Sequence, residues 1–152
     1  MHMIYRLLIV SLTSLAIVAS CSPAKDVTIN KNTYSEKEII INHQIQWLDL
    51  LKQDDNHYIV FVYSETCGLC HDMLDEIVAF ATDEIMPTYF VDTSTNDVPR
   101  TINAETDMAS IDEVSIIGTP TIIEIEQGKV ISNIPGLDDC LSFLNEKRMN
   151  KT

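Results

Sequence analysis

The chain has 152 residues, 45% of them hydrophobic, which suits one packed domain and argues against a wholly disordered protein. Its formal net charge is −13 at pH 7, and the part after residue 20 carries 9 basic and 23 acidic residues. A surface this acidic repels nucleic acid and anionic lipid head groups, so we exclude nucleic-acid partners and membrane docking through a basic patch.

Residues 1–20 have the order of features that is typical of a secretory signal peptide. Arg6 supplies a positive charge, Leu7–Ala19 is an apolar stretch, and small residues precede Cys21. The run Val18-Ala19-Ser20-Cys21 resembles a lipobox, the cleavage sequence of bacterial lipoproteins. The resemblance implies cleavage before Cys21 and lipidation of its sulfur, which would hold the protein on a membrane outside the cytoplasm. A plain signal peptide and an uncleaved anchor helix remain alternatives, and both deliver the domain to the same side.

The rest of the chain is interpreted as a polar tether over residues 21–36 and one domain over 37–148. The spacing of apolar residues predicts the secondary structure. In chain order it indicates the end of an edge strand at Ile39–Ile41, a helix over Asn42–Lys52, a buried strand over Tyr58–Tyr63, a helix from about Cys67 to Thr82, a strand over Thr88–Val91, a long loop over Thr93–Thr106, a short helix over Met108–Ile116, strands over Thr121–Ile125 and Lys129–Ile134 joined at Gln127-Gly128, and a closing helix marked by Leu137, Leu141 and Leu144. This order predicts an α/β fold with a central mixed β-sheet flanked by helices.

The strongest chemical signal is the motif Cys67-Gly68-Leu69-Cys70, which follows the buried strand and opens a helix. A helix N-terminus presents free backbone N–H groups and the positive end of the helix dipole, which lower the pKa of a cysteine placed there. Two intervening residues place the second cysteine one turn away, where it can resolve a mixed disulfide. We expect Gly68 to allow a tight turn and to leave the first sulfur open to a protein substrate.

The run YIVFVYSETCGLC, Tyr58–Cys70, looks like the strand–CxxC–helix unit of the thioredoxin superfamily. About fifty residues later, Gly118-Thr119-Pro120-Thr121 resembles the cis-proline loop of that family. The resemblance implies a thioredoxin-like fold and a thiol–disulfide oxidoreductase with Cys67 as nucleophile and Cys70 as resolving thiol. It also implies a cis bond before Pro120, contacts between substrate and Gly68, Leu69, Thr119 and Pro120, and strand-like pairing of the substrate with Thr119. Neither a cofactor nor a metal is expected.

Three positions depart from the family pattern. Thr66 and Leu69 stand where thioredoxins carry a Trp before the motif and a Pro inside it, and Phe61 stands where they carry a buried acid. The proton acceptor for Cys70 is therefore not identified, and Glu65, the nearest acid in sequence, is interpreted as a solvated loop residue. The segment between Asp92 and Pro120 is also longer than in a minimal thioredoxin.

The expected partners are protein thiols and disulfides, with a membrane electron donor or acceptor as a further candidate. Asp72, Asp75 and Glu76 lie within two turns of Cys67, and their charge should keep the pKa of its thiol above that of the strongest oxidants. We therefore expect a mildly reducing to neutral pair and favour a reductase over a general oxidase.

Competing interpretations use the same residues. Cys67-x-x-Cys70-His71 also matches a c-type haem attachment motif, with Met73 or Met108 as an axial ligand. Neither the apolar strand before the motif nor the loop at Pro120 is needed for that function.

Two further alternatives remain. Zinc or copper could bind Cys67, Cys70 and His71 with His43 or His57, although a second close ligand pair is missing. The domain could also be a non-catalytic binding or accessory lipoprotein with a structural disulfide. Cys140 is interpreted as a half-buried core residue without a redox partner.

Overall fold

The computed structural model describes residues 35–151, so the predicted signal peptide, Cys21 and nearly all of the tether lie outside the described residues. The helices and strands in chain order are α1 (Glu36–Asn42), the 3-10 helix η1 (Trp47–Asp49), β1 (His57–Tyr63), α2 (Gly68–Thr82), β2 (Thr88–Asp92), the 3-10 helix η2 (Ile111–Glu113), β3 (Thr121–Glu126), β4 (Lys129–Pro135) and α3 (Leu137–Asn150). No helix among these is long and apolar enough to cross a membrane.

Four strands form one sheet in the order β2-β1-β3-β4. β1 pairs with β2 in parallel, whereas β3 runs antiparallel to both β1 and β4, so the sheet is mixed as predicted. Gln127 and Gly128 join β3 to β4 with φ angles of 50° and 74°, the left-handed pair that a two-residue hairpin turn requires. The predicted hairpin and the predicted α/β fold are both confirmed.

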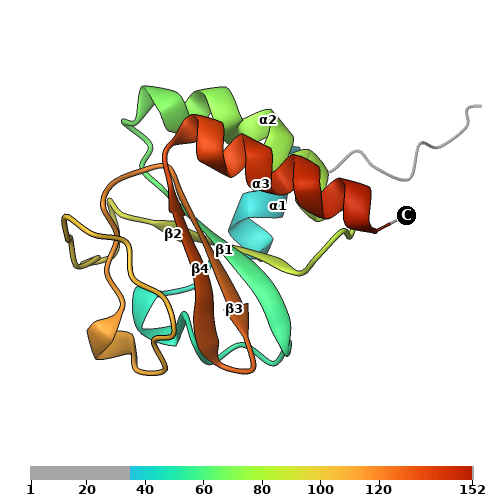
Figure 1. Ribbon diagram of the computed structural model, residues 1–152. Helices are drawn as coiled ribbons and strands as arrows, with labels where there is room; N and C mark the ends of the chain where they lie inside the picture. Colours follow the sequence, from blue (N-terminus) through green and yellow to red (C-terminus); the bar gives the residue numbers. More distant parts are fainter. Residues whose placement is uncertain (1–34, 152) are drawn as a thin grey trace, which may run out of the picture. The chain divides into compact units, whose positions relative to one another are not determined.

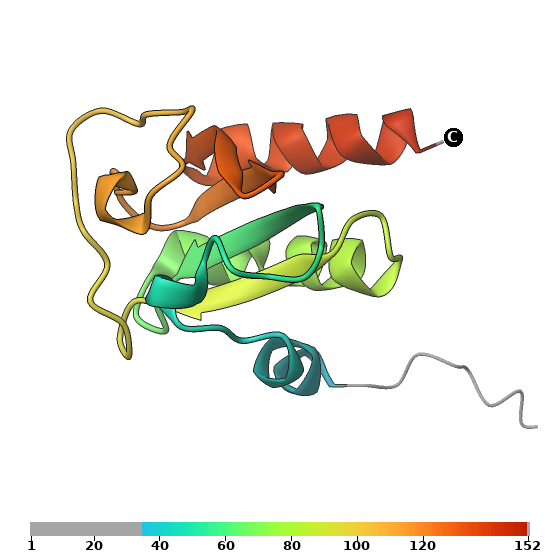
Figure 2. The same cartoon turned by 90° about the horizontal axis from the view of Figure 1, so that it is seen from below.

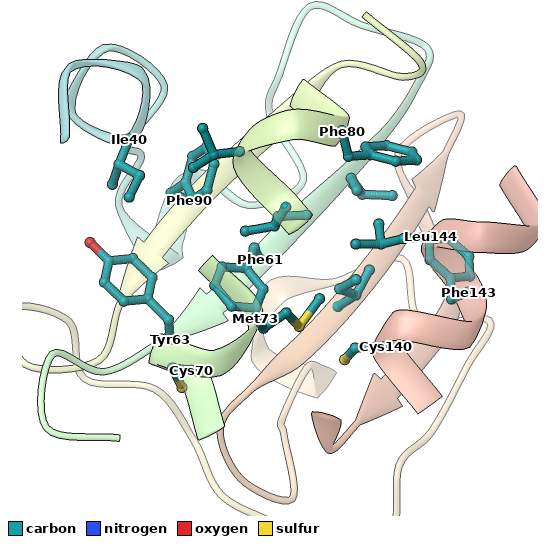
Figure 3. Close-up of a cluster of buried hydrophobic side chains, with 14 residues drawn as sticks. Ile40, Phe61, Tyr63, Cys70, Met73, Phe80, Phe90, Cys140, Phe143 and Leu144 are labelled. Atoms are coloured by element: carbon teal, nitrogen blue, oxygen red, sulfur yellow. The ribbon is translucent and has the colours of Figure 1, made fainter. Parts of the chain in front are cut away.

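The two faces of the sheet are covered differently. Helices α2 and α3 lie side by side over one face, and α1 packs against α2 (Figure 1). The cluster of buried side chains under these helices includes Phe61, Met73, Phe90 and Leu144 (Figure 3). The other face is covered by η1 and by the segment between β2 and β3. Trp47 is among the buried side chains there. Figure 2 shows this segment passing from the end of β2 around to the start of β3.

Two predictions for residues 39–52 are wrong. Ile39–Ile41 belongs to α1 instead of a strand because Ser35 and Glu38 form a capping box: the Ser35 N–H donates to Glu38 Oε2 at 2.8 Å and the Glu38 N–H donates to Ser35 Oγ at 3.3 Å. The helix predicted over Asn42–Lys52 is reduced to η1. The chain there is extended at Gln44, which bridges Phe90 of β2 in parallel register.

The helix predicted over Met108–Ile116 is also wrong, because only η2 is helical there. Met108 forms an antiparallel bridge with Val130 of β4, and Ile116 forms a parallel bridge with Arg100. Both side chains are buried, as is Val114. The apolar positions therefore mark a buried surface, but the backbone satisfies its hydrogen bonds with other segments instead of within a helix.

Candidate active site

The two motif cysteines meet at the start of α2. Cys67 is the N-cap residue, Cys70 lies in the first turn, and the two form a disulfide with 5.2 Å between their Cα atoms. The Cys70 N–H donates to Cys67 Sγ at 3.2 Å. Cys67 is partly exposed whereas Cys70 is buried, with 1% of its surface exposed. Only the first sulfur is therefore accessible to another protein.

The residues before β3 lie against this disulfide. The Thr119–Pro120 bond is cis, as predicted, and Pro120 is buried. Cys67 Sγ lies 3.4 Å from the carbonyl oxygen of Thr119. The structure thus brings the two predicted motifs together across a separation of 52 residues. The roles assigned to Thr119 and Pro120 in substrate binding stay predictions.

Gly68 and Leu69, the residues between the cysteines, face solvent. Leu69 is 51% exposed, which gives the rim of the site an apolar side chain. Gly68 does not have a positive φ, and a Cβ added to it would meet no atom within 4 Å. The turn at Gly68 therefore needs no conformation that only glycine adopts. That the absent side chain leaves the Cys67 sulfur open to a substrate stays a prediction.

The position expected to carry an acid in thioredoxins is fully apolar. Phe61 has no exposed surface, stacks on Tyr63 with 5.9 Å between ring centroids, and meets Phe90 edge-on at 6.3 Å. A carboxylate has no polar partner in such a cluster. Glu65 is exposed, as the sequence indicated.

A buried carboxylate that the sequence analysis missed lies at the end of β2. Asp92 is 4% exposed and accepts hydrogen bonds from Ser94 N at 2.8 Å and Ser94 Oγ at 2.6 Å. Its side chain and Cys70 line the same groove, which has a volume of about 610 Å³. Burial and the charges of Asp92 and Glu65 raise the pKa of Tyr63, also in this groove, to about 12.

The remaining cysteine and the histidine of the motif have separate environments. Cys140 is completely buried, more than predicted, and its Sγ donates to the carbonyl oxygen of Ile134 at 3.2 Å. Burial raises the pKa of this thiol to about 12, and the nearby Asp139 charge acts in the same direction. His71 is exposed, and its Nε2 lies 2.9 Å from the carbonyl oxygen of Glu65.

The residues considered as haem or metal ligands do not form a common site within the described residues. Met73 and Met108 belong to core clusters on opposite faces of the sheet. The ring of His43 contacts the carbonyl oxygen of Ile39 at 2.9 Å, and His57 pairs with Glu124 at 2.8 Å. Within residues 35–151, no group of three or more His, Cys, Asp or Glu side chains is arranged to hold a metal ion.

Comparisons with known proteins agree with this geometry. The family model of the thioredoxin-like domain matches residues 46–140. Mitochondrial thioredoxin 3 of Saccharomyces cerevisiae in its oxidized form superposes with a TM-score of 0.52 and 18% identity, covering 76% of this chain and 99% of that one. A mutant thioredoxin from Halobacterium salinarum gives a TM-score of 0.51 and 19% identity, covering 72% of this chain and 89% of that one. No curated protein sequence matches the chain.

Proposed function

We propose that the chain, which belongs to the thioredoxin-like domain family and is a thiol–disulfide oxidoreductase, reduces protein disulfides outside the cytoplasm from a lipid anchor at Cys21. The observation that carries the chemistry is the Cys67–Cys70 disulfide at the N-terminus of α2, with one accessible and one buried sulfur.

The reaction follows from that asymmetry. In the reduced protein the Cys67 thiolate attacks one sulfur of a substrate disulfide, a mixed disulfide forms, and the other substrate sulfur leaves as a thiolate. The Cys70 thiolate then attacks Cys67 Sγ, which releases the second substrate thiolate and forms the Cys67–Cys70 disulfide. Two electrons pass to the substrate, and a dithiol donor must return two electrons to the protein. A membrane donor would suit an anchored enzyme.

Trapping tests the order of the two cysteines. A Cys70→Ser variant should accumulate a stable mixed disulfide with a disulfide peptide because no resolving thiol remains. A Cys67→Ser variant should accumulate none, since its remaining thiol is buried. Mass spectrometry of the intact protein distinguishes the two results, and a stable adduct only on Cys67→Ser would overturn the assignment.

The charge around α2 supports the reducing direction. Asp72 and Asp75 are exposed, and neither Lys nor Arg occupies the first turn of the helix, which holds His71. Glu76 is partly neutralised by Arg148 at 2.8 Å. This negative field disfavours the Cys67 thiolate and so lowers the potential of the pair. Equilibration with glutathione should give a value nearer to about −270 mV, as in thioredoxin, than to about −120 mV, as in the strong oxidant DsbA. A value near −120 mV would reverse the proposed direction.

The anchor has its own test. Metabolic labelling of bacterial cells with a fatty-acid analogue should mark the wild-type protein but not Cys21→Ser, and only the wild type should remain with membranes in carbonate washes. Unlabelled wild-type protein would refute the lipid anchor without affecting the redox chemistry.

A further inference from the structure

A groove runs beside the buried member of the disulfide. Ile40 and Ile41 of α1, Leu74 of α2 and Tyr63 of β1 form its apolar part, and Cys70 also lines it. Ile41 is 56% exposed although it lies next to this apolar surface. Neither Thr119 nor Pro120 lines the groove, so it is separate from the loop that resembles the family's substrate-binding loop.

The hydroxyl group of Tyr63 lacks a partner in this groove. The side chain is nine-tenths buried, with 9% of the residue exposed. Its ring stacks on Phe61, and Figure 3 shows the hydroxyl pointing away from the aromatic cluster, towards the side of Ile40. Within the part of the chain that the structure describes, this hydroxyl makes no hydrogen bond. The hydroxyl is not among the fully buried atoms of residues 35–151 that lack a partner, so it reaches the groove and can donate to a group that enters it.

The polar rim of the groove is acidic. Glu36, Glu65 and Asp92 line it, against Lys37 and the imidazole of His71. The carboxylates of Asp92 and Glu65 lie close enough to Tyr63 to act on its hydroxyl. An apolar floor under a negative rim favours an occupant that has an apolar side chain beside a positive one.

We propose that this groove binds a segment of the protein substrate, with an apolar side chain against Ile41 and Leu74 and a Lys or Arg at the acidic rim. This inference rests on the proposed function, because a substrate joined to Cys67 brings its neighbouring residues to the wall that Cys70 shares with the groove. A volume of about 610 Å³ lies within the range of protein pockets that enclose small ligands, and it accepts a few residues of an extended chain. The Tyr63 hydroxyl then donates to a backbone carbonyl group of the segment.

Two synthetic disulfide peptides test the inference. They differ only beside one cysteine, where one carries Leu-Lys and the other Leu-Glu, and the full chain in its reduced form is the enzyme. We expect kcat/KM for reduction of the Leu-Lys peptide to exceed that of the Leu-Glu peptide about tenfold at low salt, and the ratio to fall as salt is added.

Variants test whether the groove causes the difference in kcat/KM between the two peptides. Ile41→Ser and Tyr63→Phe should each lower kcat/KM for the Leu-Lys peptide about five- to tenfold, through lost apolar contact and a lost hydrogen bond respectively. Reduction of glutathione disulfide, which carries no apolar, Lys or Arg side chain beside its cysteines, should stay unchanged and shows that each variant is folded. The matched control is Leu48→Ser, because Leu48 is 63% exposed in η1, does not line the groove, and should leave every rate unchanged.

Equal rates for the two peptides, or equal losses in Ile41→Ser and Leu48→Ser, would overturn the inference. Wild-type self-association that Ile41→Ser abolishes would also overturn it, because the occupant would then be a second copy of the chain. A wild-type protein that reduces neither peptide nor glutathione disulfide would instead refute the proposed function.

Discussion

Removal of the Lys147 ammonium group should destabilise the domain because it leaves a buried charge without its main partner. Glu124 of β3 has a side chain only 3% exposed, and its Oε1 accepts hydrogen bonds from Lys147 Nζ and from His57 Nε2. Breaking a buried ion pair costs about 3–5 kcal/mol. Lys147 is 23% exposed and the His57 and Ser132 contacts remain, so we expect Lys147→Met to cost about 2 kcal/mol.

The matched double variant shows whether the single variant loses stability because an attraction is lost or because a buried charge is left without a partner. Glu124→Leu combined with Lys147→Met removes both members, and replacing a buried pair by apolar groups is often nearly neutral. The double variant should therefore be within about 1 kcal/mol of wild type. Urea unfolding followed by circular dichroism measures both values. A single variant as stable as wild type, or a double variant at least 2 kcal/mol less stable, would refute the reasoning.

The pH dependence gives an independent check on the same pair. Burial alone would raise the pKa of Glu124, but the hydrogen bonds from Lys147, His57 and Ser132 outweigh it and lower the pKa below its ordinary value of 4.5. A carboxyl group with a lowered pKa in the folded state adds stability above the unfolded pKa and loses it as the pH falls through the folded pKa. The unfolding free energy should fall below about pH 4.5 in wild type and less steeply in Glu124→Gln.

Three further outcomes follow from buried or strained positions. In the folded protein the thiol of Cys140 should resist alkylation at pH 8, and Cys140→Ala should leave disulfide reduction unchanged; rapid labelling would contradict its burial. Gly128→Ala should cost about 1 kcal/mol because its φ is 74°, whereas Gly118→Ala, with an ordinary φ and open space, should cost little. Phe61→Asp should cost at least about 4 kcal/mol in urea unfolding, more than Phe61→Leu; equal losses would show that the aromatic cluster tolerates a carboxyl group.

The elements predicted correctly are those whose local pattern agrees with their tertiary role. β1 is apolar from Tyr58 to Tyr63 because both of its faces are covered, and the 3–4 spacing of apolar residues in α2 matches its single buried face. The residues of α1 were predicted wrongly because three β-branched isoleucines outweighed a capping box that begins at Ser35. Only the tertiary pairing of Met108 with Val130 decides that the segment before η2 is extended, and no local pattern shows that pairing.

The residues of the site also fall into those that short sequence motifs predict and those that they do not. Cys67, Cys70 and the Thr119–Pro120 bond belong to short motifs whose spacing carries their chemistry, and the structure brings them together. The groove beside Cys70 has no such motif. Its residues come from α1, β1, α2 and the end of β2, and the misassigned Ile39–Ile41 left one of its walls out of the prediction. Asp92 carried a detectable signal, an acid directly after an apolar strand, but the sequence did not indicate that it would be buried.

The carboxylate that lines a groove with Cys70 lies at a different place from the buried acid that thioredoxins carry. An acid at Phe61 would lie among aromatic rings on the face that α2 covers, whereas Asp92 lies at the strand end, in a groove that opens to solvent. Both oxygens of Asp92 accept hydrogen bonds from Ser94, which fixes the orientation of the carboxylate. A fixed negative charge in the groove beside Cys70 opposes formation of a second thiolate there. Resolution of the mixed disulfide therefore requires Cys70 to lose its proton against that charge.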